Sequence, residues 1–220
     1  MDLRLHRYLP VTHVDGPGAR AGVWVQGCPI RCAGCAVPCT WPPDGGSLTS
    51  VEELAAQILR GPEVEGVSLL GGEPFAQAPA LAELAKAVRG AHLSVVVFTG
   101  YEIEFIRRCR RAGWRELLAL TDLLIDGPYV AELEDYSRPW VGSSNKRYHF
   151  LTDRYRDLER RLSEIPNRVE VRISPDGRIL MNGMGRLREI EHDLFEGVAR
   201  RGPGQGRRAA GPGPGPLTPP

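Results

Sequence analysis

The 220-residue sequence has no excess of charge of one sign, because 28 Lys and Arg residues balance 27 Asp and Glu residues. A balanced chain creates no strong field, so its composition does not favour a nucleic-acid-binding or membrane-surface protein. The sequence also lacks an apolar run near the roughly 18 residues that a membrane span needs. Residues 1–7 lack the apolar core of a signal peptide. We therefore expect neither nucleic acid nor membrane as a partner.

Cysteine is scarce and unevenly placed, since four of the five cysteines lie between positions 28 and 39. Such clustering differs from a secreted disulfide framework, in which cysteines are spread through a small chain. We therefore expect a reduced, cytoplasmic protein. The length suffices for one substantial hydrophobic core, which favours one main domain with extensions over two full domains.

The clustered cysteines Cys28, Cys32 and Cys35 follow a Cys-x₃-Cys-x₂-Cys spacing. Thiolates are the soft ligands that zinc and iron–sulfur clusters select. An ordinary 4Fe–4S cluster uses four cysteines, so three would leave one iron open for chemistry. If Cys39 supplies a fourth ligand, the same loop is a zinc site or an electron-transfer centre. The spacing alone leaves both interpretations open.

Strand-like and helical segments alternate through the first 125 residues. The strand-like runs are 21–25, 66–70, 93–98 and 123–125, and the runs with helical periodicity are 51–59, 81–88 and 103–112. Ser50 and Glu53 form a capping box before the first helix, and Gly113 is the expected C-cap of the third. This alternation predicts βαβ units around a parallel sheet, which is an α/β fold.

A motif follows each predicted strand. The motifs are the cysteine loop, Gly71-Gly72-Glu73-Pro74, Thr99-Gly100-Tyr101 and Asp126-Gly127. Because parallel strands carry their sites at their carboxyl ends, we expect the four motifs to meet at one edge of the sheet.

The character of the sequence changes after residue 150. Tyr155, Leu158 and Leu162 indicate an amphipathic helix, and a hairpin is expected over 169–173 and 178–181 with its turn at 174–177. Residues 187–198 fit a further helix. Glycine and proline dominate residues 202–220, which predicts disorder.

The cysteine motif with Gly71-Gly72-Glu73-Pro74 resembles the radical S-adenosylmethionine (SAM) superfamily. The segments Thr99-Gly100-Tyr101 and Gly142-Ser143-Ser144-Asn145 narrow the resemblance to the activating proteins of anaerobic ribonucleotide reductase and pyruvate formate-lyase. The match also includes residues 15–18 with Arg20, Thr40-Trp41, Asp126-Gly127 and Trp140-Val141. The resemblance spans about residues 8–150 and implies a partial (β/α) barrel. We accordingly expect a radical SAM domain at 1–160, a C-terminal extension of hairpin plus helix at 161–201, and a disordered tail at 202–220.

The resemblance also implies roles for individual residues. Cys28, Cys32 and Cys35 would bind three irons of a 4Fe–4S cluster, and SAM would bind the fourth. The residues implied to bind the cofactors are Gly34, Cys35, Ala36, Gly71, Gly72, Glu73, Pro74 and Thr99. Those implied to face the substrate or partner are Tyr101, Asp126, Ser143, Ser144 and Asn145. The two glycines would let the backbone approach the ligand, and Glu73 would help to orient the methionine ammonium.

The implied reaction is reductive cleavage of SAM to methionine and a 5′-deoxyadenosyl radical. In the activases, that radical abstracts a hydrogen from a glycine of a partner enzyme. The expected partner is a glycyl-radical enzyme, above all anaerobic ribonucleotide reductase, and the expected electron donor is reduced flavodoxin or ferredoxin. A radical SAM enzyme that modifies a peptide or small molecule is the alternative.

Four other residues have simpler interpretations. Cys109 lies on the apolar face of a predicted helix and is expected in the core. Arg20 either pairs with a carboxylate or fixes the turn before the first predicted strand. His13 and His149 are either substrate contacts or ordinary polar residues.

Overall fold

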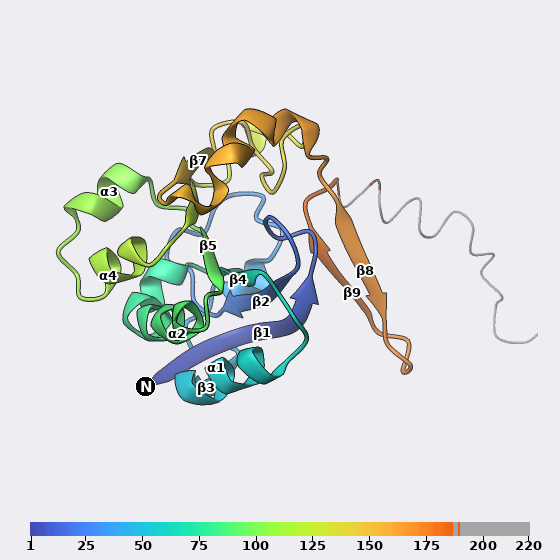
Figure 1. Cartoon of the computed structure of the whole chain (residues 1–220). Helices are drawn as coiled ribbons and strands as arrows, with labels where there is room; N and C mark the ends of the chain where they lie inside the picture. The colour runs from blue at the N-terminus through green and yellow to red at the C-terminus, as the bar shows by residue number, and fades with distance from the viewer. Residues whose placement is uncertain (187–188, 190–220) are drawn as a thin grey trace, which may run out of the picture. The chain divides into compact units, whose positions relative to one another are not determined.

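A seven-stranded sheet organises the chain, in the order β3-β1-β2-β4-β5-β6-β7 (Figure 1). The computed structural model describes residues 1–186 and 189. The strands of the sheet are β1 (Asp2–Thr12), β2 (Arg20–Val25), β3 (Ser47–Ser50), β4 (Gly66–Gly71), β5 (Ser94–Phe98), β6 (Leu123–Asp126) and β7 (Arg147–Phe150). The α-helices are α1 (Val51–Arg60), α2 (Ala78–Gly90), α3 (Ile103–Arg108) and α4 (Trp114–Ala119). The predicted α/β class is confirmed.

The centre of the sheet is parallel and its margins are antiparallel. Strands β2, β4, β5 and β6 pair in parallel. Strand β1 pairs antiparallel with β2 and β3, and β7 pairs antiparallel with β6. All four predicted strands are present within a residue or two of their expected bounds, whereas β1, β3 and β7 were not predicted.

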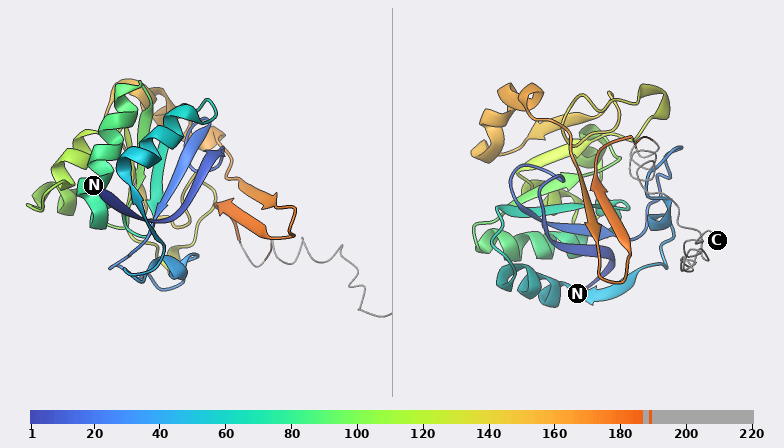
Figure 2. Two further views of the ribbon diagram at one scale, coloured as in Figure 1. Left: turned by 90° about the horizontal axis from the view of Figure 1, so that it is seen from below. Right: turned by 90° about the vertical axis from the view of Figure 1, so that its right-hand side faces the viewer.

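The two faces of the sheet follow from the alternation of side chains along each strand. Val23 and Val25 of β2 pack in one core with Leu54 of α1 and Leu81 of α2. Trp24, between the two valines, points to the opposite face. Figures 1 and 2 show α1 and α2 together beside the sheet. Helices α1 and α2 therefore cover one face of the sheet, and Trp140, Val141 and Tyr155 pack on the other face.

The cap predicted for α1 is confirmed, and the cap predicted for the third helix is wrong. Ser50 Oγ accepts a hydrogen bond from the Glu53 backbone at 3.2 Å. The third helix already ends at Arg108, and Gly113 is the N-cap of α4 with φ of 79°. A Cβ at Gly113 would lie 2.5 Å from Pro79 N, so the glycine is required by close packing against α2. Cys109, at the end of α3, packs against the main core as expected.

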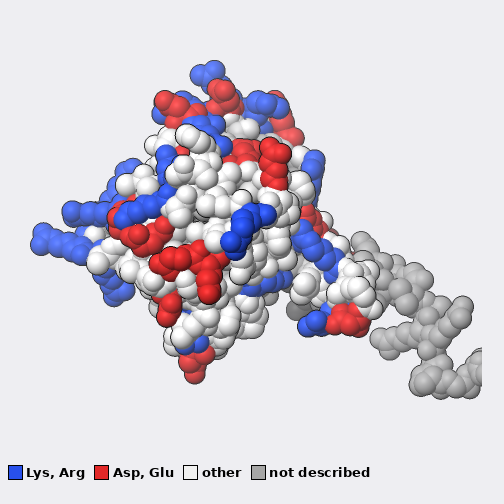
Figure 3. Space-filling model, turned by 60° about the horizontal axis from the view of Figure 1, so that its bottom comes forward, with Lys and Arg blue, Asp and Glu red and all other residues white. Residues whose placement is uncertain are grey.

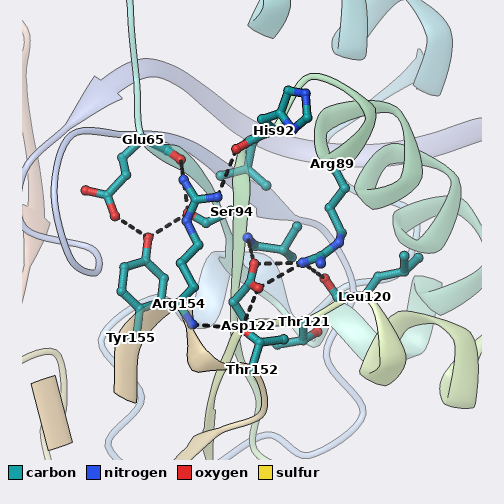
Figure 4. Close-up of polar contacts among 12 residues, drawn as sticks. Glu65, Arg89, His92, Ser94, Leu120, Thr121, Asp122, Thr152, Arg154 and Tyr155 are labelled. Carbon is teal, nitrogen blue, oxygen red and sulfur yellow. Dashed lines mark hydrogen bonds and ion pairs between the residues drawn. The ribbon is translucent and has the colours of Figure 1, made fainter. Parts of the chain in front are cut away.

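A buried carboxylate ties several elements together at the amino edge of the sheet. Asp122 accepts hydrogen bonds from the Val95 backbone at 2.8 Å, from Arg89 Nη1 at 2.9 Å and from Thr152 Oγ1 at 2.8 Å (Figure 4). It thereby joins β5, α2 and the segment after β7. The Asp122 carboxylate therefore has a structural role at this edge of the sheet.

Arg20 fixes the turn before β2, which settles the two alternatives that the sequence left open. Its side chain is fully buried and donates to Pro17 O at 3.0 Å, Ser68 Oγ at 2.8 Å and Tyr155 OH at 2.8 Å. Tyr155 comes from η4 (Asp153–Glu164), so the predicted amphipathic helix is present and has the 3₁₀ form. The expected apolar residues still pack inward, since Tyr155 is buried with Leu158 and Leu162 against it.

The predicted hairpin is confirmed as β8 (Val169–Ile173) and β9 (Ile179–Gly183), and it extends away from the main sheet (Figure 2). Its polar face contacts the region around β1. Asn182 Nδ2 donates to Thr12 Oγ1 at 2.8 Å and to Asp15 Oδ2 at 2.6 Å, and Arg172 donates to Val11 O at 2.6 Å. The domain boundaries expected at 160 and 201 stay predictions. The helix expected at 187–198 and the tail at 202–220 lie outside the described residues, apart from position 189.

The surface agrees with the balanced composition. Lys and Arg are interspersed with Asp and Glu on the face shown in Figure 3. Within the described part of the chain, no helix combines the length and apolarity that crossing a bilayer requires.

Candidate functional site

One cavity at the carboxyl edge of the parallel strands gathers the three clustered cysteines and four of the residues expected to bind the cofactors, Gly71, Gly72, Glu73 and Thr99. Three of its lining residues are the cysteines Cys28, Cys32 and Cys35, which have free thiols. The other lining residues are Ile30, Thr40, Trp41, Gly71, Gly72, Glu73, Phe98, Thr99, Gly100, Trp140, Lys146 and Met184. The motifs after β2, β4 and β5 therefore meet, which is three of the four that the sequence predicted; Asp126 and Gly127, after β6, do not line the cavity.

The cysteine loop is held by a short backbone ladder and by one side chain. Gly27 N donates to Thr40 O at 2.7 Å, and Cys28 N donates to Trp41 O at 3.1 Å. The Gln26 amide donates to Cys39 O at 3.0 Å and to Pro42 O at 2.8 Å. Gln26 was missed from the sequence, where its only signal was a polar residue directly after a buried strand.

Cys39 lies apart from the other three cysteines of the loop. It is exposed, it does not line the cavity, and its Sγ lies 3.9 Å from His6 Nε2. Among residues 1–186 and 189, no three His, Cys, Asp or Glu side chains converge as ligands of a single metal ion would. A 4Fe–4S cluster does not require that convergence, because its cysteine thiolates bind different irons.

The Cys28 thiol is partly buried in the cavity. Burial raises its pKa, while the backbone N–H groups of Arg31 and Ile30 act in the opposite direction by favouring the thiolate. A metal that binds this sulfur displaces the proton.

The Gly71-Gly72-Glu73 loop packs directly on the cysteine loop. Gly72 N donates to Val25 O at 2.8 Å, and Glu73 N donates to Gly27 O at 2.9 Å. A Cβ at Gly72 would lie 2.4 Å from Gly27 O, and one at Gly71 would lie 2.7 Å from Trp24 Cα. Gly71 also has φ of 105°. These glycines are thus required by backbone packing, a reason that the sequence did not show.

Glu73 joins the loops that follow β4 and β5. Its carboxylate accepts hydrogen bonds from Phe75 N at 2.9 Å, from Thr99 Oγ1 at 2.7 Å and from Gly100 N at 2.9 Å. The side chain is 1% exposed. Burial raises the pKa of Glu73 to about 7, although these three hydrogen bonds favour its ionised form. Much of its hydrogen-bonding capacity is therefore used within the protein.

Lys146 is a cavity residue that was not predicted. Its Nζ donates to Gly127 O at 2.5 Å. Burial lowers the pKa of Lys146, and the negative charges of Cys32, Glu73, Asp126 and Cys35 act to raise it. Lys146 directly follows the Gly142-Ser143-Ser144-Asn145 segment, and it belongs to no sequence motif of its own.

Asp126 was expected to face a partner, but the structure buries it completely. Its carboxylate accepts hydrogen bonds from Ile103 N at 2.7 Å and Arg147 Nη2 at 2.7 Å, and lies 3.0 Å from His149 Nε2. Burial opposes ionisation, but the contacts with His149, Arg147 and Ile103 N outweigh it and lower the pKa of Asp126. Asp126 thus anchors the start of α3. Tyr101, which was also expected to face a partner, stacks on Phe105 of α3 with ring centroids 5.4 Å apart.

The remaining expected residues do not line the cavity. Ser143 is buried, Ser144 is exposed, and Asn145 donates to Pro128 O at 2.8 Å. The others that do not line the cavity are Gly34 and Ala36, which are exposed, and Pro74, which is buried. His13 donates its backbone N–H to Glu170 and lines a separate cavity with Trp140.

The cavity suits an iron–sulfur cluster with a polar ligand. Three thiols supply a soft donor set. Trp41 Nε1 is buried and has no hydrogen-bond partner among the described residues, so a bound group that accepts a hydrogen bond would satisfy it. The donor chemistry and this unpaired N–H both fit such a group.

Comparison with known proteins defines first the class of domain. Residues 14–149 match the family model described as "4Fe-4S single cluster domain". The three cavity cysteines and the loops after β4 and β5 all lie within this range.

Named relatives narrow the family. The chain is 31% identical over 157 residues to the anaerobic ribonucleoside-triphosphate reductase-activating protein of Escherichia coli (strain K12), covering 68% of this chain and 99% of the relative. The protein of the same name from Enterobacteria phage T4 is 32% identical over 155 residues, covering 67% of this chain and 94% of the relative. A putative glycyl-radical enzyme activating enzyme of Haemophilus influenzae is 34% identical over 108 residues, covering 48% of this chain and 41% of the relative. The chain belongs to the family of anaerobic ribonucleoside-triphosphate reductase-activating proteins.

Proposed function

We propose that this chain is a radical SAM activase that generates a glycyl radical on an anaerobic ribonucleoside-triphosphate reductase. One observation carries the proposal: Cys28, Cys32 and Cys35 line the same cavity as Glu73 and Thr99, whereas Cys39 does not. The relatives named above are activating proteins of that reductase.

Each part of the cavity has a role in the proposal. The three cysteines hold a 4Fe–4S cluster, and Gly72, Glu73 and Thr99 border the bound SAM. The reduced cluster and SAM, when bound, supply the one-electron chemistry that ends in a glycyl radical on the partner. The protein contributes a shaped cavity, the unpaired Trp41 N–H as a hydrogen-bond donor, and loops held rigid by the Glu73 carboxylate.

We also propose the type of barrel, the electron donor and the cellular compartment of this protein. We assign the partial (β/α) barrel of this superfamily, which is supported by parallel strands whose carboxyl ends carry the site. A reduced flavodoxin or ferredoxin would supply the electron. All five cysteines are free thiols, which suits a reducing compartment such as the cytoplasm.

The cysteine assignment is tested by iron and sulfide analysis of anaerobically reconstituted protein. Wild type should hold close to four irons and four sulfides per chain, by the composition of the cluster. Cys28→Ala, Cys32→Ala and Cys35→Ala should each lose most of both, while Cys39→Ala and Cys109→Ala serve as matched controls that retain them. Loss of the cluster in Cys39→Ala, or one zinc without sulfide in wild type, would contradict the proposal.

The activity is tested with the reductase from the same genome. Anaerobic mixing with SAM and a reductant should produce a glycyl-radical doublet in the electron paramagnetic resonance spectrum. The triple variant without Cys28, Cys32 and Cys35 is the control and should give no doublet. If SAM were cleaved while every glycyl-radical enzyme of the genome stayed silent, a peptide or small-molecule substrate would replace the reductase.

A further inference from the structure

Lys146 is the one cation among the described residues that line the cysteine cavity, and Glu73 is the one carboxylate. The chain has only two lysines, Lys86 and Lys146. Lys86 lies on α2, is 45% exposed and pairs with Glu83 and Glu116. The two lysines therefore offer a natural comparison between a cation inside the cavity and one in water.

The negative groups near Lys146 differ in how far they are already satisfied. Asp126 pairs with Arg147 at 2.7 Å, and the Glu73 carboxylate accepts three hydrogen bonds from other groups. Cys32 and Cys35 line the same cavity as Lys146 and interact electrostatically with it. The charge of Lys146 therefore acts on the two cysteines as well as on the two carboxylates.

The position of Lys146 is set by the backbone. Its Nζ donates to Gly127 O at 2.5 Å, directly after β6. An ammonium has three N–H donors, so this bond leaves two that are free to interact with the cavity. Because Lys146 is partly buried, its charge is screened less than that of a surface lysine.

A fixed cation affects the two redox states of a cluster unequally. Reduction adds one electron from an external low-potential donor and makes the cluster more negative. Net charge, hydrogen bonds and solvent exposure set the potentials of iron–sulfur clusters. A nearby ammonium therefore stabilises the reduced state more than the oxidised state.

We propose that Lys146 sets the reduction potential of the cluster held by Cys28, Cys32 and Cys35, by placing a positive charge beside Cys32 and Cys35. The inference rests on the proposed function, because it presupposes the cluster. Lys146 acts here through the charge of the cavity, which makes the cluster easier to reduce.

The experiment is a potentiometric titration of the full-length, anaerobically reconstituted protein without SAM. The reduced cluster is followed by electron paramagnetic resonance, and iron and sulfide are measured in every sample. Lys146→Gln keeps a hydrogen-bond donor but removes the charge, so its midpoint potential should become more negative. Lys146→Arg keeps both the donor and the charge and should titrate as wild type does. Lys86→Gln removes a charge from the exposed lysine and should leave the midpoint unchanged.

Two results would overturn the inference while leaving the proposed function intact. A wild-type midpoint in Lys146→Gln would show that the charge does not reach the cluster. An equal shift in Lys146→Arg and Lys146→Gln would show that packing, and not charge, is responsible. Failure of the proposed function is distinguishable, because wild type itself would then hold no iron–sulfur cluster.

Discussion

Replacing Gly72 by alanine should disrupt the contact between the cysteine loop and the Gly71-Gly72-Glu73 loop, which both line the cavity. The added Cβ would lie 2.4 Å from Gly27 O and 3.0 Å from Val25 O. Both neighbours are backbone carbonyls, which cannot rotate away as a flexible side chain would. The clash therefore has to be relieved by moving one loop relative to the other.

The cost of this movement can be estimated from the contacts that hold the loops. Overpacking costs about 1–3 kcal/mol. Separation would also lose the hydrogen bonds from Gly72 N to Val25 O and from Glu73 N to Gly27 O, each worth about 0.5–1.5 kcal/mol. We expect the free energy of unfolding to fall by about 2–6 kcal/mol, against typical domain stabilities of about 5–15 kcal/mol. Because Gly27 precedes Cys28, the iron content should also fall.

The assay is denaturant unfolding of the metal-free protein, with iron analysis after reconstitution. Gly90→Ala is the matched control, because Gly90 ends α2 and a Cβ there would meet nothing within 4 Å. Alanine is the better helix former, so this control should match or exceed wild-type stability by up to about 1 kcal/mol. Wild-type stability and iron content in Gly72→Ala would refute the reasoning. Full iron content with reduced SAM turnover would instead support the role suggested by the sequence, approach of the backbone to the ligand.

Two further predictions concern buried polar groups in the metal-free protein. The Glu73 pKa is raised from 4.5 to about 7, so between these pH values the folded state holds a proton that the unfolded state releases. The free energy of unfolding of wild type should therefore fall by about 3 kcal/mol as pH rises from 4.5 to 7. Glu73→Gln should remove this dependence on pH. Urea unfolding measures this free energy at pH 5 and pH 8. An equal change between the two pH values in wild type and in Glu73→Gln would contradict the prediction. Asn182→Ala removes the hydrogen bonds to Asp15 and Thr12 and should lower the free energy of unfolding by about 1–3 kcal/mol in the same assay. Arg178→Ala, in the exposed hairpin turn, is the control and should leave that free energy almost unchanged. Equal losses in the two variants would argue against a stabilising role of the Asn182 hydrogen bonds.

The parallel centre of the fold could be predicted because each of its strands is locally distinctive. Strands β2, β4, β5 and β6 are continuous buried runs, each followed by a glycine-containing motif. Strand β1 was overlooked, although its buried Leu3 and Leu5 alternate with more exposed residues in the way that a strand requires. The short strands β3 and β7 carry too few buried residues to give such a signal.

The cavity could be predicted only where its residues belong to contiguous motifs. The three cysteines, Glu73 and Thr99 were found in this way. Lys146 could not be recognised, because its role depends on Gly127 O and on a cavity formed by distant loops. Gly113 was misassigned for a related reason: a glycine after a helical run fits a C-cap locally, whereas the contact with Pro79 that requires it is tertiary.

The contact between Asn182 and Asp15 has a consequence for where this protein can be cut or recombined. Asp15 lies inside residues 14–149, the range that matches the family model, and Asn182 lies more than thirty residues beyond its end. Asp15 is 3% exposed and receives hydrogen bonds from Asn182 and Thr12. A chain cut to residues 14–149 would lose the hydrogen bond from Asn182 to Asp15 and would expose the Asp15 carboxylate to water. The stretch that similarity delimits is therefore shorter than the unit that folds, and a chimera with a relative should carry the hairpin together with the loop that it supports.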